Sequence, residues 1–299
     1  MKASLKSRLL SGPTLLAPGC YDALSALLIE QAGFEALYLS GASVSYTQLG
    51  RPDIGLVSFD ELAGIVGRIR ERVDLPLIVD ADTGFGSALN VRRTVRLLER
   101  MGAAAIQIED QVFPKRCGHL AGKALIPTEE MVGKLMAACD IRHSDETLII
   151  ARTDAIAVEG FDAALDRAEA YLEAGADLLF VEAPRSLEEM DRIVERFRGR
   201  VPLLANMVEG GTTPIRTLDE LSESGFDIVI SPGALVRAYV HMATGFLDSL
   251  KKMGSTRPQF DNMVDFAQLN GTLGMAELTR IGERYDPSLR LDVYRSKAH

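Results

Sequence analysis

Oxygen-rich side chains in the first half of the chain could hold a metal ion. Asp80 and Asp82 stand two residues apart in an Asp-Ala-Asp-Thr-Gly stretch, and Glu109 follows a later apolar run. Carboxylates that share one pocket repel each other unless a cation or protons intervene. Mg²⁺ is held by one or two carboxylates with water and substrate oxygens, whereas zinc favours His and Cys. We therefore expect a Mg²⁺ site; the alternative is that the two aspartates only shape a turn.

A second group of reactive side chains lies in the long segment 110–127, which contains Lys115, Arg116, Cys117 and His119. Cationic neighbours lower the pKa of a thiol and prepare it for proton transfer or nucleophilic attack. A long loop over an active site is typical of a mobile lid. The alternative is a basic surface loop in which the cysteine is incidental.

Eight short aliphatic runs supply the elements that could position these residues. Each is nearly continuous rather than alternating, as in parallel strands that are buried on both faces. The predicted strands are 14–18, 36–40, 76–80, 104–108, 148–152, 177–181, 202–206 and 227–231. Amphipathic segments separate them, and capping boxes begin at Ser58, Ser186 and Thr217.

Eight β–α units predict an α/β fold of the (β/α)8 TIM-barrel type, with an open doubly wound sheet as the alternative. We predict one barrel domain over residues 1–299, in which 255–299 form a C-terminal helical extension. Active sites of such barrels lie at the C-terminal ends of the strands. The polar residues at those ends are Ser40, Asp80, Asp82, Glu109, Asp110, Arg152, Asp154, Glu182, Asn206 and Ser231.

Composition excludes several classes of function. The net charge of −9 argues against nucleic acid as a partner but leaves an anionic small molecule open. No apolar run is long enough for a membrane span, and three scattered cysteines indicate a reducing cytoplasm. Gly84-Phe-Gly86 lacks the third glycine of a dinucleotide fingerprint and stands beside two aspartates, so NAD is not expected there.

Four stretches resemble the isocitrate lyase / phosphoenolpyruvate mutase superfamily, and the resemblance covers nearly the whole chain. They are DADTGFG at 80–86, IEDQ at 108–111, KRCGH at 115–119 and ARTD at 151–154. The KRCGH stretch is typical of the carbon–carbon lyase branch, with its 2-methylisocitrate and 2,3-dimethylmalate lyases and the petal death protein. The resemblance implies a homotetramer, a dimer of dimers, in which C-terminal helices such as 263–284 swap between subunits.

The resemblance also implies a metal site and its chemistry. Asp80 and Asp82 would hold Mg²⁺, or Mn²⁺, while Asp53 and Glu109 steady its water ligands. Cys117 would be the general acid and Tyr38 a candidate base, with Lys115 and His119 beside the acid. The substrate contacts would come from Ser40, Gly41, Ala42, Arg116, Gly118, Arg152, Glu182, Asn206 and Phe266.

Two positions depart from the tricarboxylate lyases. Phe266 falls where 2-methylisocitrate lyases carry an arginine for the third carboxylate, and Met207-Val208 replaces a threonine-bearing sequence. An unpaired carboxylate against Phe266 would cost on the order of a few kcal/mol. We therefore expect a 2-alkylmalate or 2,3-dimethylmalate, cleaved to a 2-oxo acid such as pyruvate plus a carboxylate.

Three alternatives remain. The first is cleavage of the tricarboxylate 2-methylisocitrate to pyruvate and succinate. The second is hydrolysis or decarboxylation of oxaloacetate on the same scaffold, which would not require Cys117. The third is a non-catalytic dicarboxylate-binding barrel, which would need a broken metal site. In each case the expected partner is a small di- or tricarboxylate.

Overall fold

The computed structural model of the chain describes residues 4–118 and 122–286. The chain divides into two compact units, Met1–Ala238 and Tyr239–His299. The boundary lies inside helix α10 (Ala234–Met253), whereas the predicted extension begins at residue 255. The assignment of one domain with an extension therefore stays a prediction.

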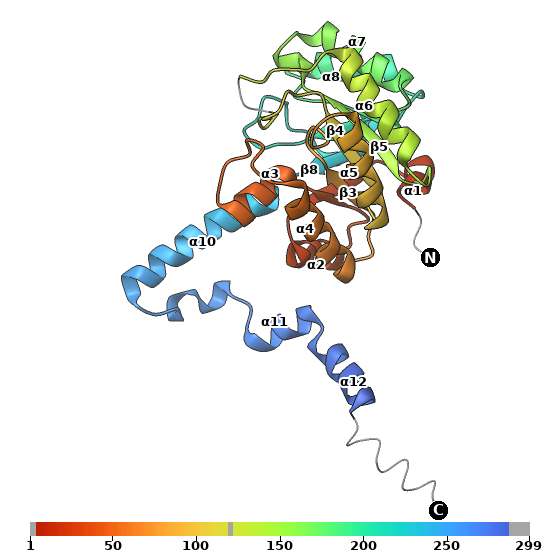
Figure 1. The fold of residues 1–299 in the computed structure, drawn as a ribbon. Helices are drawn as coiled ribbons and strands as arrows, with labels where there is room; N and C mark the ends of the chain where they lie inside the picture. The colour runs from red at the N-terminus through yellow and green to blue at the C-terminus, as the bar shows by residue number, and fades with distance from the viewer. Residues whose placement is uncertain (1–3, 119–121, 287–299) are drawn as a thin grey trace, which may run out of the picture. The chain divides into compact units, whose positions relative to one another are not determined.

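The first unit is built on one sheet of eight parallel strands (Figure 1). The sheet order is β6-β5-β4-β3-β2-β1-β8-β7, and a parallel bridge from Leu179 to Leu203 joins β6 to the residue before β7. The predicted barrel is confirmed, and the open sheet is wrong. The strands are β1 (Leu15–Cys20), β2 (Leu37–Leu39), β3 (Leu77–Asp80), β4 (Ala105–Glu109), β5 (Leu148–Thr153), β6 (Leu178–Val181), β7 (Leu204–Asn206) and β8 (Ile228–Ser231).

Helices follow the strands and cover the outside of the sheet (Figure 1). Two predicted capping boxes form: Ser58 with Glu61 begins α4, and Thr217 with Glu220 begins α9. The helices of the first unit are α1 (Leu5–Ser11), α2 (Ala23–Gln31), α3 (Gly41–Val44), α4 (Phe59–Arg72), α5 (Ala88–Arg100), α6 (Thr128–Ile141), α7 (Phe161–Glu173), α8 (Leu187–Phe197) and α9 (Leu218–Ser224), with a π-helical turn (Ser45–Leu49) and a 3₁₀ turn (Ala155–Ala157).

Strand alternation divides the apolar core into two clusters. Ile78 of β3 points into the barrel interior, whereas Leu77 and Val79 pack under the surrounding helices. Leu5 of α1 belongs to the interior cluster, so the N-terminal helix helps to close the barrel at the N-terminal ends of the strands. Because apolar side chains fill most of the interior, polar side chains gather mainly toward the strand ends.

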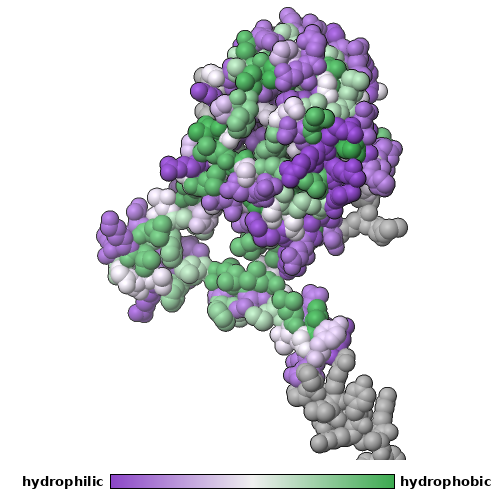
Figure 2. Space-filling view, viewed as in Figure 1, coloured by the Kyte–Doolittle hydropathy of each residue, from purple (hydrophilic) through white to green (hydrophobic). Residues whose placement is uncertain are grey.

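The second unit contains the rest of α10, a 3₁₀ turn (Arg257–Asn262), α11 (Phe266–Leu273) and α12 (Met275–Tyr285). None of its described residues, 239–286, is buried. Large apolar side chains such as Phe260, Val264 and Leu278 are more than half exposed, and apolar surface lies along this unit in Figure 2. Among the helices of the described residues, none has the length and apolar character to cross a bilayer.

Candidate active site

Two aspartates meet a helix start at the C-terminal end of β3. Asp82 has a left-handed backbone (φ 48°), and its N–H donates to Asp80 Oδ1 at 3.2 Å. Asp tolerates this conformation better than most residues. A Cβ added at Gly41, the first residue of α3, would lie 3.2 Å from Asp82 Oδ1 and 3.3 Å from Asp80 Oδ2. The glycine therefore allows the backbone of α3 to approach both carboxylates closely.

The Lys115 ammonium lies between two of the expected metal carboxylates. Its Nζ is 2.7 Å from an Asp53 oxygen and 2.7 Å from Asp82 Oδ1, and the lysine is buried. Burial raises the pKa of Asp82 to about 6, against the lowering effect of Lys115. The backbone N–H of Cys117 donates to the Asp53 carbonyl at 3.3 Å. The loop that carries the cysteine is thus tied to the carboxylate cluster.

The carboxylate of Glu109 has two oxygen acceptors that receive no hydrogen bond from the part of the chain that the structure describes. It is fully buried, and neither carboxylate oxygen has a hydrogen-bond partner among the described residues. Its Cα pairs with that of Arg152 on β5, and Arg152 Nη1 lies 3.3 Å from Glu109 Oε2. Burial raises the pKa of Glu109 well above its usual value. A buried carboxylate in this state needs a proton, a cation or ordered water to satisfy it.

The chemistry of these donors fits Mg²⁺. The cluster offers hard carboxylate oxygens without His or Cys, and the unsatisfied oxygens of Glu109 could accept from water ligands of such an ion. Within 4–118 and 122–286, no three His, Cys, Asp or Glu side chains are arranged as ligands of one metal. Mg²⁺ does not require three direct protein ligands, because it keeps several of its waters.

Arg152 is the centre of a buried ionic network. Its Nε and Nη2 donate to Asp154 at 2.9 and 3.1 Å, and its guanidinium lies 5.2 Å from the Phe180 ring centre. Lys123 Nζ lies 2.9 Å from Asp154 and also donates to the carbonyl of Gly118. The Lys123 and Asp154 side chains are 1% and 0% exposed. The ion pair therefore links the Cys117 loop to the end of β5.

Gly118 brings the loop into contact with two predicted substrate-binding residues. A Cβ at this position would lie 2.6 Å from Arg152 Nη2 and 2.7 Å from Glu182 Cγ. Asn206 Nδ2 donates to Glu182 at 3.1 Å, and Asn206 Oδ1 is buried without a partner in the described chain. The structure thus brings Gly118, Arg152, Glu182 and Asn206 together.

Tyr38 lies beneath the carboxylates inside the barrel. Its hydroxyl donates to Gln107 Oε1 at 2.9 Å, and Gln107 Nε2 donates to Asp80 Oδ1 at 3.1 Å. Burial raises the pKa of Tyr38 well above its usual value, and Asp80 acts in the same direction. The phenol is therefore a hydrogen-bond donor in this structure.

The other predicted site residues have different surroundings. Ser40 caps α3 by accepting from Ser43 N at 3.2 Å, and Ala42 follows Gly41 in that helix. The Arg116 side chain is exposed, while its backbone pairs with the Gln111 amide. His119 lies outside the described residues. Phe266 is 85% exposed and belongs to the second unit.

Asp110 has a structural role and does not belong to the site. It accepts from Thr153 Oγ1 at 2.7 Å, Tyr171 OH at 2.8 Å and Asp154 N at 2.9 Å. Alternation along β4 turns Glu109 and Asp110 to opposite faces, and that signal was available in the sequence. Sequence reasoning missed the parts played by Gln107 and Lys123, because no local pattern reports a partner on another strand.

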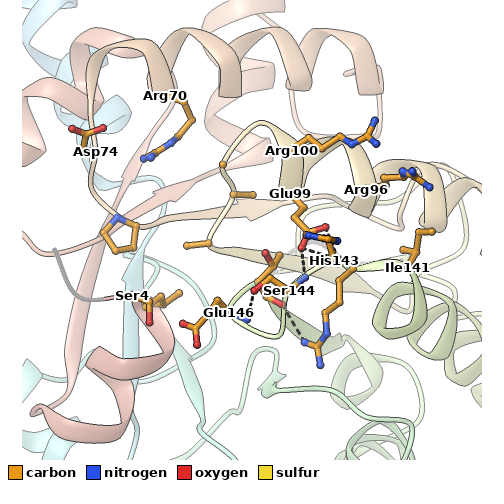
Figure 3. A pocket seen from close by; sticks show the side chains of 17 residues that line it. Ser4, Arg70, Asp74, Arg96, Glu99, Arg100, Ile141, His143, Ser144 and Glu146 are labelled. Atoms are coloured by element: carbon orange, nitrogen blue, oxygen red, sulfur yellow. Dashed lines mark hydrogen bonds between the residues drawn. The ribbon is translucent and has the colours of Figure 1, made fainter. Parts of the chain in front are cut away.

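The opposite end of the barrel holds a cavity of about 850 Å³ with charged walls. It lies at the N-terminal ends of the strands, next to Pro76, Ala104 and Thr147. Figure 3 shows Glu99 directed at the 143–144 backbone, where its carboxylate accepts from the N–H groups of both residues at 2.8–2.9 Å. Glu99 thus satisfies backbone groups and stabilises this end of the barrel.

Comparison with known proteins agrees with this geometry. The family model described as phosphoenolpyruvate phosphomutase matches residues 5–250. The chain belongs to this family. It is 42% identical over 283 residues to the 2,3-dimethylmalate lyase of Eubacterium barkeri, covering 95% of this chain and 97% of the relative. It is 50% identical over 260 residues to the 2-methylisocitrate lyase of Aeropyrum pernix, covering 87% and 83%.

Solved structures confirm the family resemblance and the fold. A crystal structure of 2,3-dimethylmalate lyase has a TM-score of 0.90 at 35% identity, covering 96% of this chain and 95% of that one. A phosphonopyruvate hydrolase complex with oxalate and Mg²⁺ has a TM-score of 0.85 at 31% identity, covering 94% and 97%. A lyase and a hydrolase therefore share this fold.

Proposed function

We propose that the protein is a Mg²⁺-dependent carbon–carbon lyase. Its substrate is a 2-hydroxydicarboxylate with small alkyl groups, of the 2,3-dimethylmalate type, and its products are a 2-oxo acid such as pyruvate and a carboxylate. The contact of Gly118 with Arg152 and Glu182 carries this proposal. Through this contact the residue after Cys117 lies against the Arg152 guanidinium, which can bind a substrate carboxylate next to the carboxylate cluster.

The reaction removes one proton and delivers another. A base takes the proton of the C2 hydroxyl, the C2–C3 bond breaks, and C2 becomes the carbonyl carbon of the 2-oxo acid. The electron pair of that bond stays on C3 and delocalises into the adjacent carboxylate. Arg152 stabilises the doubled charge on this carboxylate, and the Cys117 thiol donates its proton to C3. Mg²⁺, when bound, lowers the pKa of the C2 hydroxyl.

Separate residues hold the two ends of the substrate. Asp80 and Asp82 would hold the ion, and Asp53 and Glu109 would steady its water ligands. The hydroxyl and backbone N–H groups of residues 40–42 bind the carboxylate on C2, as expected at a helix start. Glu182, Asn206 and the lid loop enclose the other end. The closed lid excludes bulk water, which would otherwise protonate C3 without selectivity.

Tyr38 is the proposed base, and its surroundings set a condition on that role. Its phenol is buried and donates to Gln107, so it must lose its own proton before it can accept one from the substrate. Tyr38→Phe is expected to abolish turnover if a phenolate is the base. A loss of only a few fold would mean that the phenol merely orients Gln107.

The choice among substrates rests on the third carboxylate. By the resemblance, Phe266 stands where 2-methylisocitrate lyases carry an arginine for such a group, and its lack of charge favours a dicarboxylate. The 50% identity to the Aeropyrum pernix 2-methylisocitrate lyase keeps 2-methylisocitrate as the second candidate, with another cation gripping its third carboxylate. Oxaloacetate, cleaved by hydrolysis or decarboxylation, is the remaining alternative.

We also propose a cytoplasmic homotetramer, a dimer of dimers, in which the C-terminal helices swap between subunits. The second unit supports this, because its described residues bury no side chain and expose Phe260, Val264 and Leu278. Exposed apolar surface of this kind marks protein–protein contacts. Light scattering coupled to size exclusion measures the mass, and a monomer would overturn the assembly without affecting the lyase assignment.

The first test measures 2-oxo-acid release, coupled to NADH oxidation by lactate dehydrogenase. The substrates are 2,3-dimethylmalate and 2-methylisocitrate with Mg²⁺, for wild type and Cys117→Ser. Oxaloacetate needs direct product detection because it decarboxylates spontaneously. Preference for the malate derivative with a nearly inactive variant supports the proposal. Preference for 2-methylisocitrate would move the assignment to the tricarboxylate, and full activity of Cys117→Ser would refute the lyase mechanism.

A further inference from the structure

Gln107 is a polar side chain in the apolar interior of the barrel. It is 0% exposed and lies two residues after Ala105 on β4, so both point to the same inner face. An amide in such a place costs stability unless its hydrogen bonds are made. Here they are made to Tyr38 of β2 on one side and to Asp80 of β3 on the other.

The chemistry of the partners fixes the orientation of this amide. An ionised carboxylate oxygen can only accept, so Gln107 must present its Nε2 to Asp80. The Oε1 atom then faces the Tyr38 hydroxyl, which donates to it. Three side chains from three neighbouring strands form one directed chain of hydrogen bonds, from Tyr38 through Gln107 to Asp80.

The chain ends on one particular oxygen of Asp80. Oδ1 accepts from Gln107 Nε2 at 3.1 Å and from Asp82 N at 3.2 Å. The other oxygen, Oδ2, faces the start of α3, where a Cβ on Gly41 would lie 3.3 Å away. Two donors on Oδ1 hold the carboxylate plane, and Oδ2 is left to face the site.

We propose that Gln107 is a positioning residue of the metal site, which orients Asp80 so that Oδ2 is presented to a divalent cation. Tyr38 acts through the same amide, because its hydroxyl holds Gln107 in the donating orientation. The inference rests on the proposed metal-dependent function. Partners that orient a metal ligand in this way contribute about tenfold to hundredfold to metal affinity.

The test is direct titration of the substrate-free protein with Mg²⁺ by calorimetry and with Mn²⁺ by electron paramagnetic resonance. Gln107→Met has a similar length and no hydrogen bonds, and should bind both ions about tenfold to hundredfold more weakly. Gln107→Glu keeps an acceptor toward Tyr38 but faces Asp80 with a carboxyl group in place of the amide donor, so it should disturb the orientation of Asp80 and weaken binding even if the methionine variant does not fold. Tyr38→Phe should have a smaller effect in the same direction.

The matched control is Ile150→Val, which alters the same barrel interior without touching the hydrogen-bond chain. It should bind both ions as the wild type does, whatever its thermal stability. If Gln107→Met is impaired only in metal binding, its activity should also recover partly at high Mg²⁺. Wild-type affinity in both Gln107 variants would overturn the inference. A wild type that binds neither ion would overturn the proposed metal site and this inference together.

Discussion

The two ends of the barrel use charge in opposite ways. At the N-terminal end, Glu99 accepts from backbone N–H groups at the rim of an open cavity. At the C-terminal end, burial raises the pKa of both Asp82 and Glu109, and the Glu109 oxygens have no hydrogen-bond donor in the described chain. Satisfied charges stabilise a fold, whereas buried, incompletely satisfied ones mark a place where something else must bind.

The largest effect on turnover is expected at the C-terminal end, from Cys117→Ser. A hydroxyl is a much weaker acid than a thiol, so loss of the general acid should lower kcat by about 10²–10⁴-fold. The coupled 2-oxo-acid assay measures it. Cys139→Ser is the matched control: its thiol lies on α6 and contacts the Gly175 carbonyl at 3.2 Å, outside the proposed site, and activity should be retained. Equal losses in both variants would contradict the contrast between site and scaffold.

A smaller loss is expected when the loop is detached from the network. Lys123→Met removes the buried ammonium that joins Asp154 to Gly118, while Arg152 still satisfies Asp154. We expect kcat/KM to fall about tenfold, since a misplaced loop impairs positioning more than chemistry. A Lys6→Met variant controls for removal of an ion pair, because Lys6 pairs with Asp145 at the surface. Unchanged kinetics in Lys123→Met would show that the loop is held by other contacts.

Sequence alone predicted the frame more fully than the site. Aliphatic runs located all eight strands, because a strand buried on both faces leaves a continuous pattern that needs no partner to interpret. The same runs located Asp80, Glu109 and Arg152 at their ends. The sequence could not show that Lys123 pairs with Asp154, or that Gln107 joins Tyr38 to Asp80. Those contacts depend on strand register and loop path, which no local pattern encodes.

The stability of the metal-free protein should fall as pH rises, because the carboxyls at the C-terminal end of the barrel have raised pKa values. The folded-state pKa of Asp82 is raised to about 6, and that of Glu109 is raised as well. A carboxyl with a raised pKa binds its proton more tightly in the folded state, so the free energy of unfolding falls as pH rises from about 4 through 6. For Asp82 the loss is on the order of 2–3 kcal/mol.

Thermal unfolding of the EDTA-treated protein at pH 5 and pH 8 measures this loss, and Mg²⁺ should reverse it at pH 8. Asp82→Asn cannot ionise at this position and should flatten the profile. A metal-free protein that is more stable at pH 8 than at pH 5 would contradict the interpretation that ionising these buried carboxyls destabilises the fold.

The smallest effect on turnover is expected from Glu99→Ala at the N-terminal end. The substitution removes the carboxylate that accepts from the N–H groups of His143 and Ser144. Hydrogen bonds to charged groups contribute about 1.5–3 kcal/mol each, less where solvent can replace them, so unfolding should require about 1–2 kcal/mol less. Turnover should stay within about twofold of wild type, since this end stabilises strands and contacts no substrate. Chemical denaturation measures the free energy of unfolding, and the coupled assay measures turnover. A drop in kcat with unchanged stability would mean that the N-terminal end takes part in function, and the contrast between the two ends would fail.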